Sequence, residues 1–331
     1  MYMQTHNPNL PFVREDYKGN TLVKGIFSND GDIKQVPMKS VLKWQLSKNP
    51  QGSQKKEEKK GAFRLPITKD ELVFNSNKDC IVWLGHASFF IRINGVSLLL
   101  DPCLEDLPFI PRLSPKPYDY AEMKGIDYIL LSHGHRDHLD LKSLKQILEY
   151  NPDAHFLAGL KTDTILKKLK IKSYQEAGWW QQYNIPEQDL KIVYLPAKHW
   201  NRRGVRDYNK TLWGSFWIES NGQRIYFAGD TAKWDHFKEI NTIMGAPDIA
   251  LMPIGAYKPQ FIMSFAHVNP TESVEGFNQL GANTFVPMHY ATYDLSNEPL
   301  SEPIVETRQL AKEGKLQGKL KELAVGEAFW Y

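Results

Sequence analysis

Short apolar runs alternate with stretches of helical period from about residue 80 onward. The runs Ile81–Leu84, Phe89–Ile93 and Val96–Leu100 have the length and composition of strands. Asn94-Gly95 separates the last two runs. Both residues tolerate positive φ, so this dipeptide predicts a tight β-hairpin.

Helical periods alternate with strands further along the chain. Helices are predicted over Leu141–Tyr150, Thr162–Lys170, His236–Met244, Thr271–Leu280 and Val305–Lys315. Asn269 can cap the fourth of these, with Glu272 as an early acidic residue. Strands mixed with helices in both halves, together with hairpins, predict a mixed-sheet α/β fold and not an all-parallel, doubly wound one.

The first part of the chain differs from the rest. Residues 1–75 are polar, and we predict that they form an N-terminal extension packed on or flanking a main domain of residues 76–331. The charge run Lys55–Lys60 predicts a solvated or mobile loop within this extension.

A short amphipathic segment, Val41–Leu46, precedes that loop, with Lys39, Lys43 and Lys48 around it. One interpretation is that its apolar residues pack against the main domain, which is the simpler reading of a short apolar stretch. The other is reversible docking at a membrane surface, which needs exposed apolar residues beside basic ones.

A cluster of metal-competent residues follows the apolar run Tyr128–Leu131. His133, His135, Asp137 and His138 lie within six positions, although the whole chain holds only 10 histidines. Imidazole nitrogen and carboxylate oxygen are ligands that zinc and other first-row divalent ions prefer. The alternative is a polar surface turn with a chance histidine cluster. The density of ligands favours a metal site.

Three more candidates follow strand-like runs: His199, Asp230 and His289. In an α/β architecture such positions gather functional side chains. Taken singly, His199 could be an interfacial histidine beside Trp200, Asp230 a helix cap and His289 a core histidine. Together with the first cluster they supply enough ligands for two metal ions.

The order His-x-His-x-Asp-His, His, Gly-Asp-Thr, His resembles the metallo-β-lactamase superfamily, and most closely its N-acyl-phosphatidylethanolamine-hydrolysing phospholipase D group. The likeness runs from about Cys80 to the C-terminus. The stretches that carry it are Trp83–Ala87, Asp101-Pro102, Gly178–Trp180, Pro196–Trp200, Asn209–Ser215, Phe227–Thr231, Pro253–Tyr257 and His267–Pro270.

This resemblance implies an αβ/βα sandwich, with two facing mixed β-sheets, outer helices and metals at one edge. It implies one ion held by His133, His135 and His199 and a second held by Asp137, His138 and His289. Asp230 would bridge both ions, and a hydroxide between them would attack the substrate. The donor set favours zinc, with iron or manganese as alternatives.

Two stretches depart from the group's pattern. Tyr290 follows the last ligand where tryptophan is expected, and Lys258–Phe261 stands where an acidic residue, proline and arginine are expected. We expect both to touch substrate and not metal.

Further residues have assignments that the sequence leaves open. Asp137 would both ligate and orient the attacking hydroxide. By resemblance, His267 contacts the phosphate or assists the leaving group, unless it only bonds to backbone. His86 is either a residue that orients a metal ligand or a satisfied core histidine. Asp101 either orients a histidine or ends a strand in an Asp-Pro turn.

A set of arginines after His199 is similarly open. Arg202, Arg203 and Arg206 suit an anionic phosphate or an anionic membrane, and a solvated loop explains them equally well.

Composition excludes several classes of function. The 331 residues are 42% hydrophobic, and 41 basic against 38 acidic residues leave a net charge of +3, which gives no case for nucleic-acid binding. The two cysteines, Cys80 and Cys103, make no disulfide framework. No apolar run is long enough to cross a bilayer, and the N-terminus lacks a signal pattern, so we expect a cytoplasmic or peripheral membrane protein.

The leading functional prediction is a metal-dependent phosphodiesterase of the phospholipase D type acting on N-acyl-phosphatidylethanolamine-like phospholipids. The alternative enzyme is a soluble metallo-hydrolase of a small phosphate ester or lactone, similar to the ascorbate-phosphate lactonase branch of the superfamily. A non-catalytic metal-binding scaffold is disfavoured by the complete ligand set.

Overall fold

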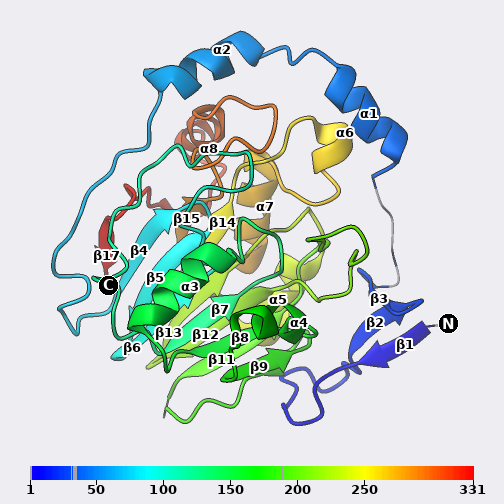
Figure 1. Cartoon of the computed structure of the whole chain (residues 1–331), viewed down its shortest axis with the longest axis vertical. Coiled ribbons are helices and arrows are strands. Elements are labelled where there is room, and N and C mark those ends of the chain that lie inside the picture. Colours follow the sequence, from blue (N-terminus) through cyan, green and yellow to red (C-terminus); the bar gives the residue numbers. More distant parts are fainter. Residues whose placement is uncertain (1, 31, 33–35, 188) are drawn as a thin grey trace.

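Two seven-stranded mixed sheets face each other in the computed structural model, which describes the chain except residues 1, 31, 33–35 and 188 (Figure 1). The first sheet contains, in spatial order, β17 (Ala328–Trp330), β4 (Cys80–Gly85), β5 (Ser88–Ile93), β6 (Val96–Leu100), β7 (Tyr128–Leu131), β8 (His155–Gly159) and β9 (Tyr174–Ala177). The second contains β10 (Gln181–Gln182), β11 (Lys191–Leu195), β12 (Ser215–Ser220), β13 (Gln223–Phe227), β14 (Ile249–Pro253), β15 (Thr284–Met288) and β16 (Lys319–Leu320).

Each sheet has an antiparallel half and a parallel half. Strands β17, β4, β5 and β6 pair antiparallel, and β6 to β9 pair parallel. In the second sheet β10 to β13 are antiparallel, and β13 to β16 are parallel. The predicted αβ/βα sandwich with two mixed sheets is therefore confirmed.

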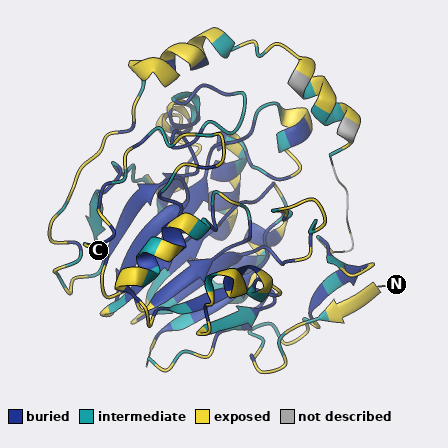
Figure 2. Ribbon diagram, in the orientation of Figure 1, coloured by how far each residue is buried: buried dark blue, intermediate teal, exposed yellow. Residues whose placement is uncertain are grey.

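The main apolar core lies between the sheets. Phe89 of β5 and Phe227 of β13 meet across it in an edge-to-face contact, with ring centroids 6.3 Å apart. A second cluster, which includes Leu144 and Ile147, fills the outer face of the first sheet under α3 (Leu141–Tyr150). Figure 2 shows the consequence, because the central strands of the two large sheets are buried while the outer faces of the helices are exposed.

Local sequence signals account for the hairpin and most helices. Asn94 and Gly95 have φ of 50° and 77°, as the predicted turn requires. The other helices of this domain are α4 (Asp163–Leu166) with a 3-10 turn (Lys167–Leu169), α5 (His236–Met244), α6 (Gln260–Met263), α7 (Pro270–Leu280) and α8 (Glu302–Lys312). The predicted bounds of α3 and α5 are confirmed.

The N-terminus of α7 carries a complete capping box. The Asn269 side chain accepts from the backbone N–H of Glu272 at 2.9 Å, and the Glu272 carboxylate accepts from the N–H of Asn269 at 3.1 Å. These bonds satisfy donors that a helix start leaves unpaired. The helix consequently begins at Pro270, one residue before the predicted start.

The N-terminal residues form a small sheet followed by a helical strap. The sheet contains β1 (Tyr2–Thr5), β2 (Asn20–Val23) and β3 (Ile26–Phe27). The strap, residues 38–62, comprises α1 (Met38–Leu46), α2 (Gly52–Glu57) and a π-helical turn (Glu58–Ala62). Figure 1 shows it as a blue arch that passes α6 and then α8.

The prediction of a solvated or mobile loop over Lys55–Lys60 is wrong, because this run lies in α2 and the turn after it. Lys55 and Glu58 share one helix face and are buried. Lys55 pairs with Asp294 at 2.5 Å, and Glu58 accepts from the hydroxyl of Ser301 at 2.7 Å. The other four charged residues of the run are exposed. Partners distant in sequence thus turn a charge run into an amphipathic helix.

No helix within the described residues is long and apolar enough to span a bilayer.

Candidate metal centre

The predicted ligands gather where four strands end at one edge of the sandwich. The loop with His133, His135, Asp137 and His138 leaves β7. His199 follows β11, Asp230 follows β13 and His289 directly follows β15. All seven predicted ligands lie in groups whose candidate donor atoms are within 4.8 Å of one another.

Asp101 holds the histidine loop from beneath. Its buried carboxylate accepts from the N–H of Ser132 at 2.7 Å, from the Ser132 hydroxyl at 2.5 Å and from Nδ1 of His138 at 2.7 Å. Because Nδ1 of His138 is held by this carboxylate, Nε2 faces the centre, where a cation can displace its proton. Of the two interpretations of Asp101, the geometry favours the one in which it orients a histidine.

Arg203 also fixes this loop, through hydrogen bonds to its backbone carbonyls. Its Nη1 donates to the carbonyls of Gly134 and Leu139, both at 2.7 Å. Burial lowers the pKa of this guanidinium to about 10. Neither interpretation of Arg203 from sequence is right, since its guanidinium binds backbone carbonyls. Arg202 and Arg206 are exposed.

One group of donors contains His133, His135, His199 and Asp230. Nδ1 of His135 lies 2.9 Å from Nε2 of His133 and 3.1 Å from Nε2 of His199. Nδ1 of His199 donates to the carbonyl of Ala266 at 2.9 Å, so its Nε2 carries the lone pair. Three imidazole nitrogens thus converge beside a carboxylate oxygen, which is the donor chemistry of a divalent metal site.

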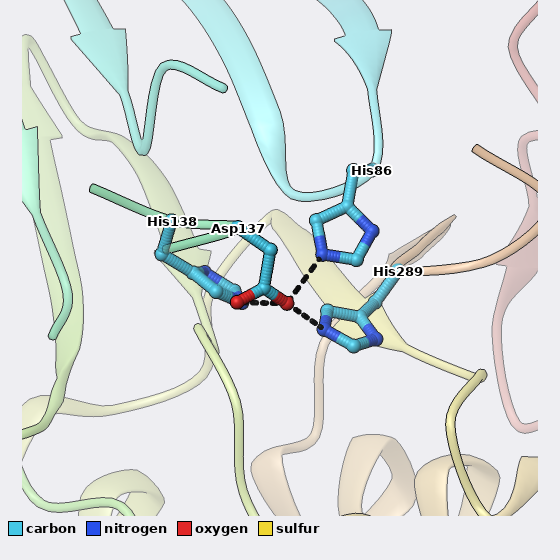
Figure 3. Close-up of side chains that lie close together, drawn as sticks. All are labelled: His86, Asp137, His138 and His289. Carbon is cyan, nitrogen blue, oxygen red and sulfur yellow. Dashed lines mark hydrogen bonds and ion pairs between the residues drawn. The ribbon is translucent and has the colours of Figure 1, made fainter. Parts of the chain in front are cut away.

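A second group contains His86, Asp137, His138 and His289 (Figure 3). Oδ2 of Asp137 lies 3.0 Å from Nε2 of His86 and 3.7 Å from Nε2 of both His138 and His289. Asp230 joins this group to the first, because its carboxylate lies 3.1 Å from Nε2 of His138 and 3.0 Å from Nε2 of His289.

Several of these inward-facing atoms lack a hydrogen-bond partner. Among the described residues, Nε2 of His138, Nε2 of His289 and Oδ1 of Asp230 are buried and form no hydrogen bond of acceptable geometry. Buried polar atoms are normally paired, and unpaired ones often mark a ligand or ion site. The residues present therefore fit divalent cations.

The protonation pattern follows from burial and mutual attraction. Burial lowers the pKa of His133 and of His199 well below the usual value, so both rings are neutral. Burial also opposes a charge on His289, but Asp230 and Asp137 outweigh it and raise the pKa of His289 to about 9. Before any cation binds, the proton on His289 therefore places positive charge beside the carboxylates of Asp137 and Asp230.

His267 lies at the rim of both groups. Its Nδ1 is 3.9 Å from Oδ2 of Asp230, and its ring centroid is 5.2 Å from that of His199. Burial lowers its pKa to about 4, and Nδ1 forms no hydrogen bond. The ring also lines a cavity of about 270 Å³. This position suits a group that contacts substrate beside the metals.

His86 belongs to one of the donor groups, although the sequence did not place it among the candidate ligands. It lies in the turn between β4 and β5 with φ of 53°. Its ring is buried, and its centroid lies 4.0 Å from that of His289. The signal available in the sequence was a Gly-His pair between two apolar runs, which also fits an ordinary turn.

The two departures from the family pattern lie in different surroundings. The ring of Tyr290 is buried and stacks on Trp83 at 5.2 Å, and substrate contact by this residue stays a prediction. Lys258 turns away from the cavity to pair with Glu302 of α8 at 2.6 Å. Phe261 lines the cavity beside His267, where a substrate group can reach it.

Comparison with known proteins identifies the family. Residues 97–290 match the family described as the β-lactamase superfamily domain. The chain belongs to the metallo-β-lactamase superfamily. An N-acyl-phosphatidylethanolamine-hydrolysing phospholipase D of Caenorhabditis elegans is 31% identical over 75% of this chain and 72% of its own length. The mitochondrial enzyme of the same name from Saccharomyces cerevisiae is also 31% identical, over 76% of this chain but just 56% of its own length.

The match to a third relative extends over almost all of that relative's length. A protein of Hyperthermus butylicus named as a metal-dependent hydrolase is 29% identical over 75% of this chain and 98% of its own. A solved metallo hydrolase of Ignicoccus hospitalis has the same fold, with a TM-score of 0.60, 21% identity, and coverage of 77% of this chain and 98% of that one. The chain is thus a metal-dependent hydrolase of this superfamily.

We predict that His86→Asn lowers metal content at the second group. Asparagine tolerates positive φ, so the turn is kept while the imidazole beside Asp137 is lost. Loss of such a supporting contact typically costs 10- to 100-fold in metal affinity or activity. Elemental analysis and hydrolysis rate, measured beside a His155→Asn control, check this. Unchanged metal content and rate would assign His86 to the core alone.

We also predict that metal binding releases protons. His289, with a pKa of about 9, and His138, whose pKa is raised by Asp230 and the other nearby carboxylates in spite of burial, are protonated at neutral pH. A cation must displace these protons, so affinity falls as the pH is lowered, by about tenfold per pH unit for each proton displaced. Chelator competition between pH 6 and 8 measures the slope. A flat profile would contradict the prediction.

Proposed function

We propose that this hydrolase is a binuclear phosphodiesterase that cleaves N-acyl-phosphatidylethanolamine-like phospholipids in the manner of phospholipase D. The products would be phosphatidic acid and the amide-bearing alcohol. The observation that carries the proposal is the pair of adjacent donor groups that share the buried carboxylate of Asp230. The names and coverage of the nematode and yeast relatives support the choice of lipid.

The donor groups suggest which residues would hold two divalent ions. His133, His135 and His199 would hold one, and Asp137, His138 and His289 the other. Asp230 lies between the groups and would contact both. Ions bound there would supply hydroxide at neutral pH and neutralise charge on the phosphate. Zinc suits this set of nitrogen and oxygen donors, and iron or manganese are the alternatives.

The protein's own side chains would orient the reaction. Asp137 is fixed by Nε2 of His86, so its carboxylate can hold an attacking water by hydrogen bonding. Nδ1 of His267 lies 3.9 Å from Oδ2 of Asp230, at the cavity, where the neutral ring can hydrogen-bond the phosphate or the departing oxygen. Both groups lie in a largely desolvated edge, where electrostatic interactions are stronger than in water.

The cavity beside His267 provides a place for part of the substrate. Tyr257, Gln260, Phe261, Ser264, Asn269 and Glu272 line it with His267. Aromatic and hydrogen-bonding groups occur side by side there, which suits an amide-bearing alcohol with an apolar continuation.

The alternative is hydrolysis of a small soluble phosphate ester or lactone. It is favoured by one specific observation: the archaeal relative, named without a lipid substrate, matches over 98% of its own length.

A substrate panel separates the two proposals. N-acyl-phosphatidylethanolamine in mixed micelles, bis(p-nitrophenyl) phosphate and a lactone are assayed with the same preparation, and metal content is measured in parallel. We expect close to two metal equivalents per chain and fastest turnover of the lipid. Asp230→Ala should abolish activity and lower metal content, while Asp153→Ala on the surface should change neither. A fully active, metal-replete Asp230→Ala protein would refute the shared-carboxylate assignment.

We predict that His267→Ala keeps its metals but lowers lipid turnover about 100-fold or more, the usual range for a hydrogen-bond donor positioned at developing charge. The loss should be smaller on bis(p-nitrophenyl) phosphate, because nitrophenolate is a stable anion that needs less help from a hydrogen bond as it departs. His155→Ala is the matched control. If the turnover rates on both substrates stay within about twofold of those of the parent, His267 has only a structural role.

A further inference from the structure

Helix α1 presents an exposed face on which lysine and leucine alternate. Lys39, Leu42, Lys43 and Leu46 are all exposed and follow the spacing i, i+3, i+4, i+7, which places them on one side of a helix. Leu42 is 55% and Leu46 79% accessible to solvent. Scattered exposed leucines are ordinary, but two on one face of a nine-residue helix form a stripe.

The other side of α1 is attached to the main domain. Nε1 of Trp44 donates to the side chain of Asn297 at 3.0 Å, and the side-chain amide of Asn49 donates to the backbone carbonyl of the same residue at 2.8 Å. Helix α1 also contacts α6. The helix is therefore anchored by its polar contacts while its leucine stripe faces outward.

Helix α6 and the residue that follows its C-cap extend this stripe. Phe261 and Phe265 are 45% and 43% exposed, and Nζ of Lys43 lies 5.5 Å from the ring centroid of Phe261. Phe261 also lines the cavity beside His267. The apolar surface thus continues from α1 into the cavity next to the metal centre.

The charged residues in the chain segment that contains α1 are all basic. From Val36 to Lys56 the chain contains five lysines and neither aspartate nor glutamate. Lys55 is paired with Asp294, whereas Lys39, Lys43 and Lys48 are exposed. Basic residues beside exposed apolar ones complement a surface that is anionic outside and apolar within.

We propose that α1 and α6 form a docking surface for an anionic phospholipid membrane. The docking surface consists of Lys39, Leu42, Lys43, Leu46, Phe261 and Phe265. The leucines and phenylalanines enter the interface, the lysines contact lipid phosphates, and the cavity opens toward the lipid. This inference rests on the proposed lipid substrate. Of the two earlier interpretations of Val41–Leu46, core packing is wrong for Leu42 and Leu46, which are exposed.

Vesicle binding tests the docking surface separately from catalysis. Cosedimentation is measured with vesicles of phosphatidylcholine alone and with phosphatidylserine added. We expect binding to the anionic vesicles that weakens tenfold or more in Leu42→Ser/Leu46→Ser and in Lys39→Glu/Lys43→Glu. Turnover of bis(p-nitrophenyl) phosphate should stay within twofold of the parent in both.

Matched controls remove equivalent groups elsewhere. Ile67→Ser/Leu72→Ser changes two exposed apolar residues outside the surface, and Lys142→Glu/Lys145→Glu makes the same charge change on α3. Both should bind vesicles as the parent does, beyond any general effect of net charge.

Each outcome has a defined meaning. Absence of vesicle binding by the parent, equal binding by the leucine variant, or equal loss of soluble-substrate turnover would each overturn the docking surface. A parent dimer that the leucine changes dissociate, seen by sedimentation, would assign the stripe to a second copy and also overturn it. Vesicle binding that depends on these residues, without turnover of any phospholipid, would uphold the docking surface and refute the proposed substrate.

Discussion

Two largely buried carboxylates, Asp137 and Asp230, determine which other groups this edge of the protein must contain. Removing such charges from water costs several kcal/mol each unless positive charge or hydrogen bonds compensate. In this protein the histidines around the two carboxylates supply that compensation. In the protein alone, protons on His138 and His289 balance the carboxylates, which is why the pKa of both rings is raised in spite of burial. Divalent cations would replace those protons with more charge in the same place.

The rigid surroundings of these groups follow from the same requirement. A charged group in a dry site is stabilised only by partners held in position, and the loop that carries four of the donors is held by Asp101 below and Arg203 beside it. Neither of these two residues belongs to the pattern of predicted ligands. Their contacts convert a flexible polar loop into a preorganised set of donors.

The sequence predicted most of what depends on local signals. The Asn94-Gly95 hairpin, the bounds of α3 and α5 and the capping box of α7 follow from turn chemistry and period. The order of the elements predicted a mixed-sheet α/β fold, and the family resemblance implied the sandwich. The seven candidate ligands were found because their types and order form a pattern. The sequence failed where a residue's partner lies far along the chain. Burial of Lys55 depends on Asp294, and the stack of Tyr290 depends on Trp83.

The distribution of donors along the chain has a consequence for how the protein matures. They begin with the turn after β4 and end with the residue after β15, so nearly every strand must be in place before the full set exists. The histidine loop alone emerges early and offers a partial, weaker chelate, while the loops that supply the remaining donors close over long separations. During synthesis, an ion captured by that loop would be held loosely and exchangeably. The identity of the resident metal would then be set by which ions are available when β15 joins the second sheet, and not by the first ion encountered.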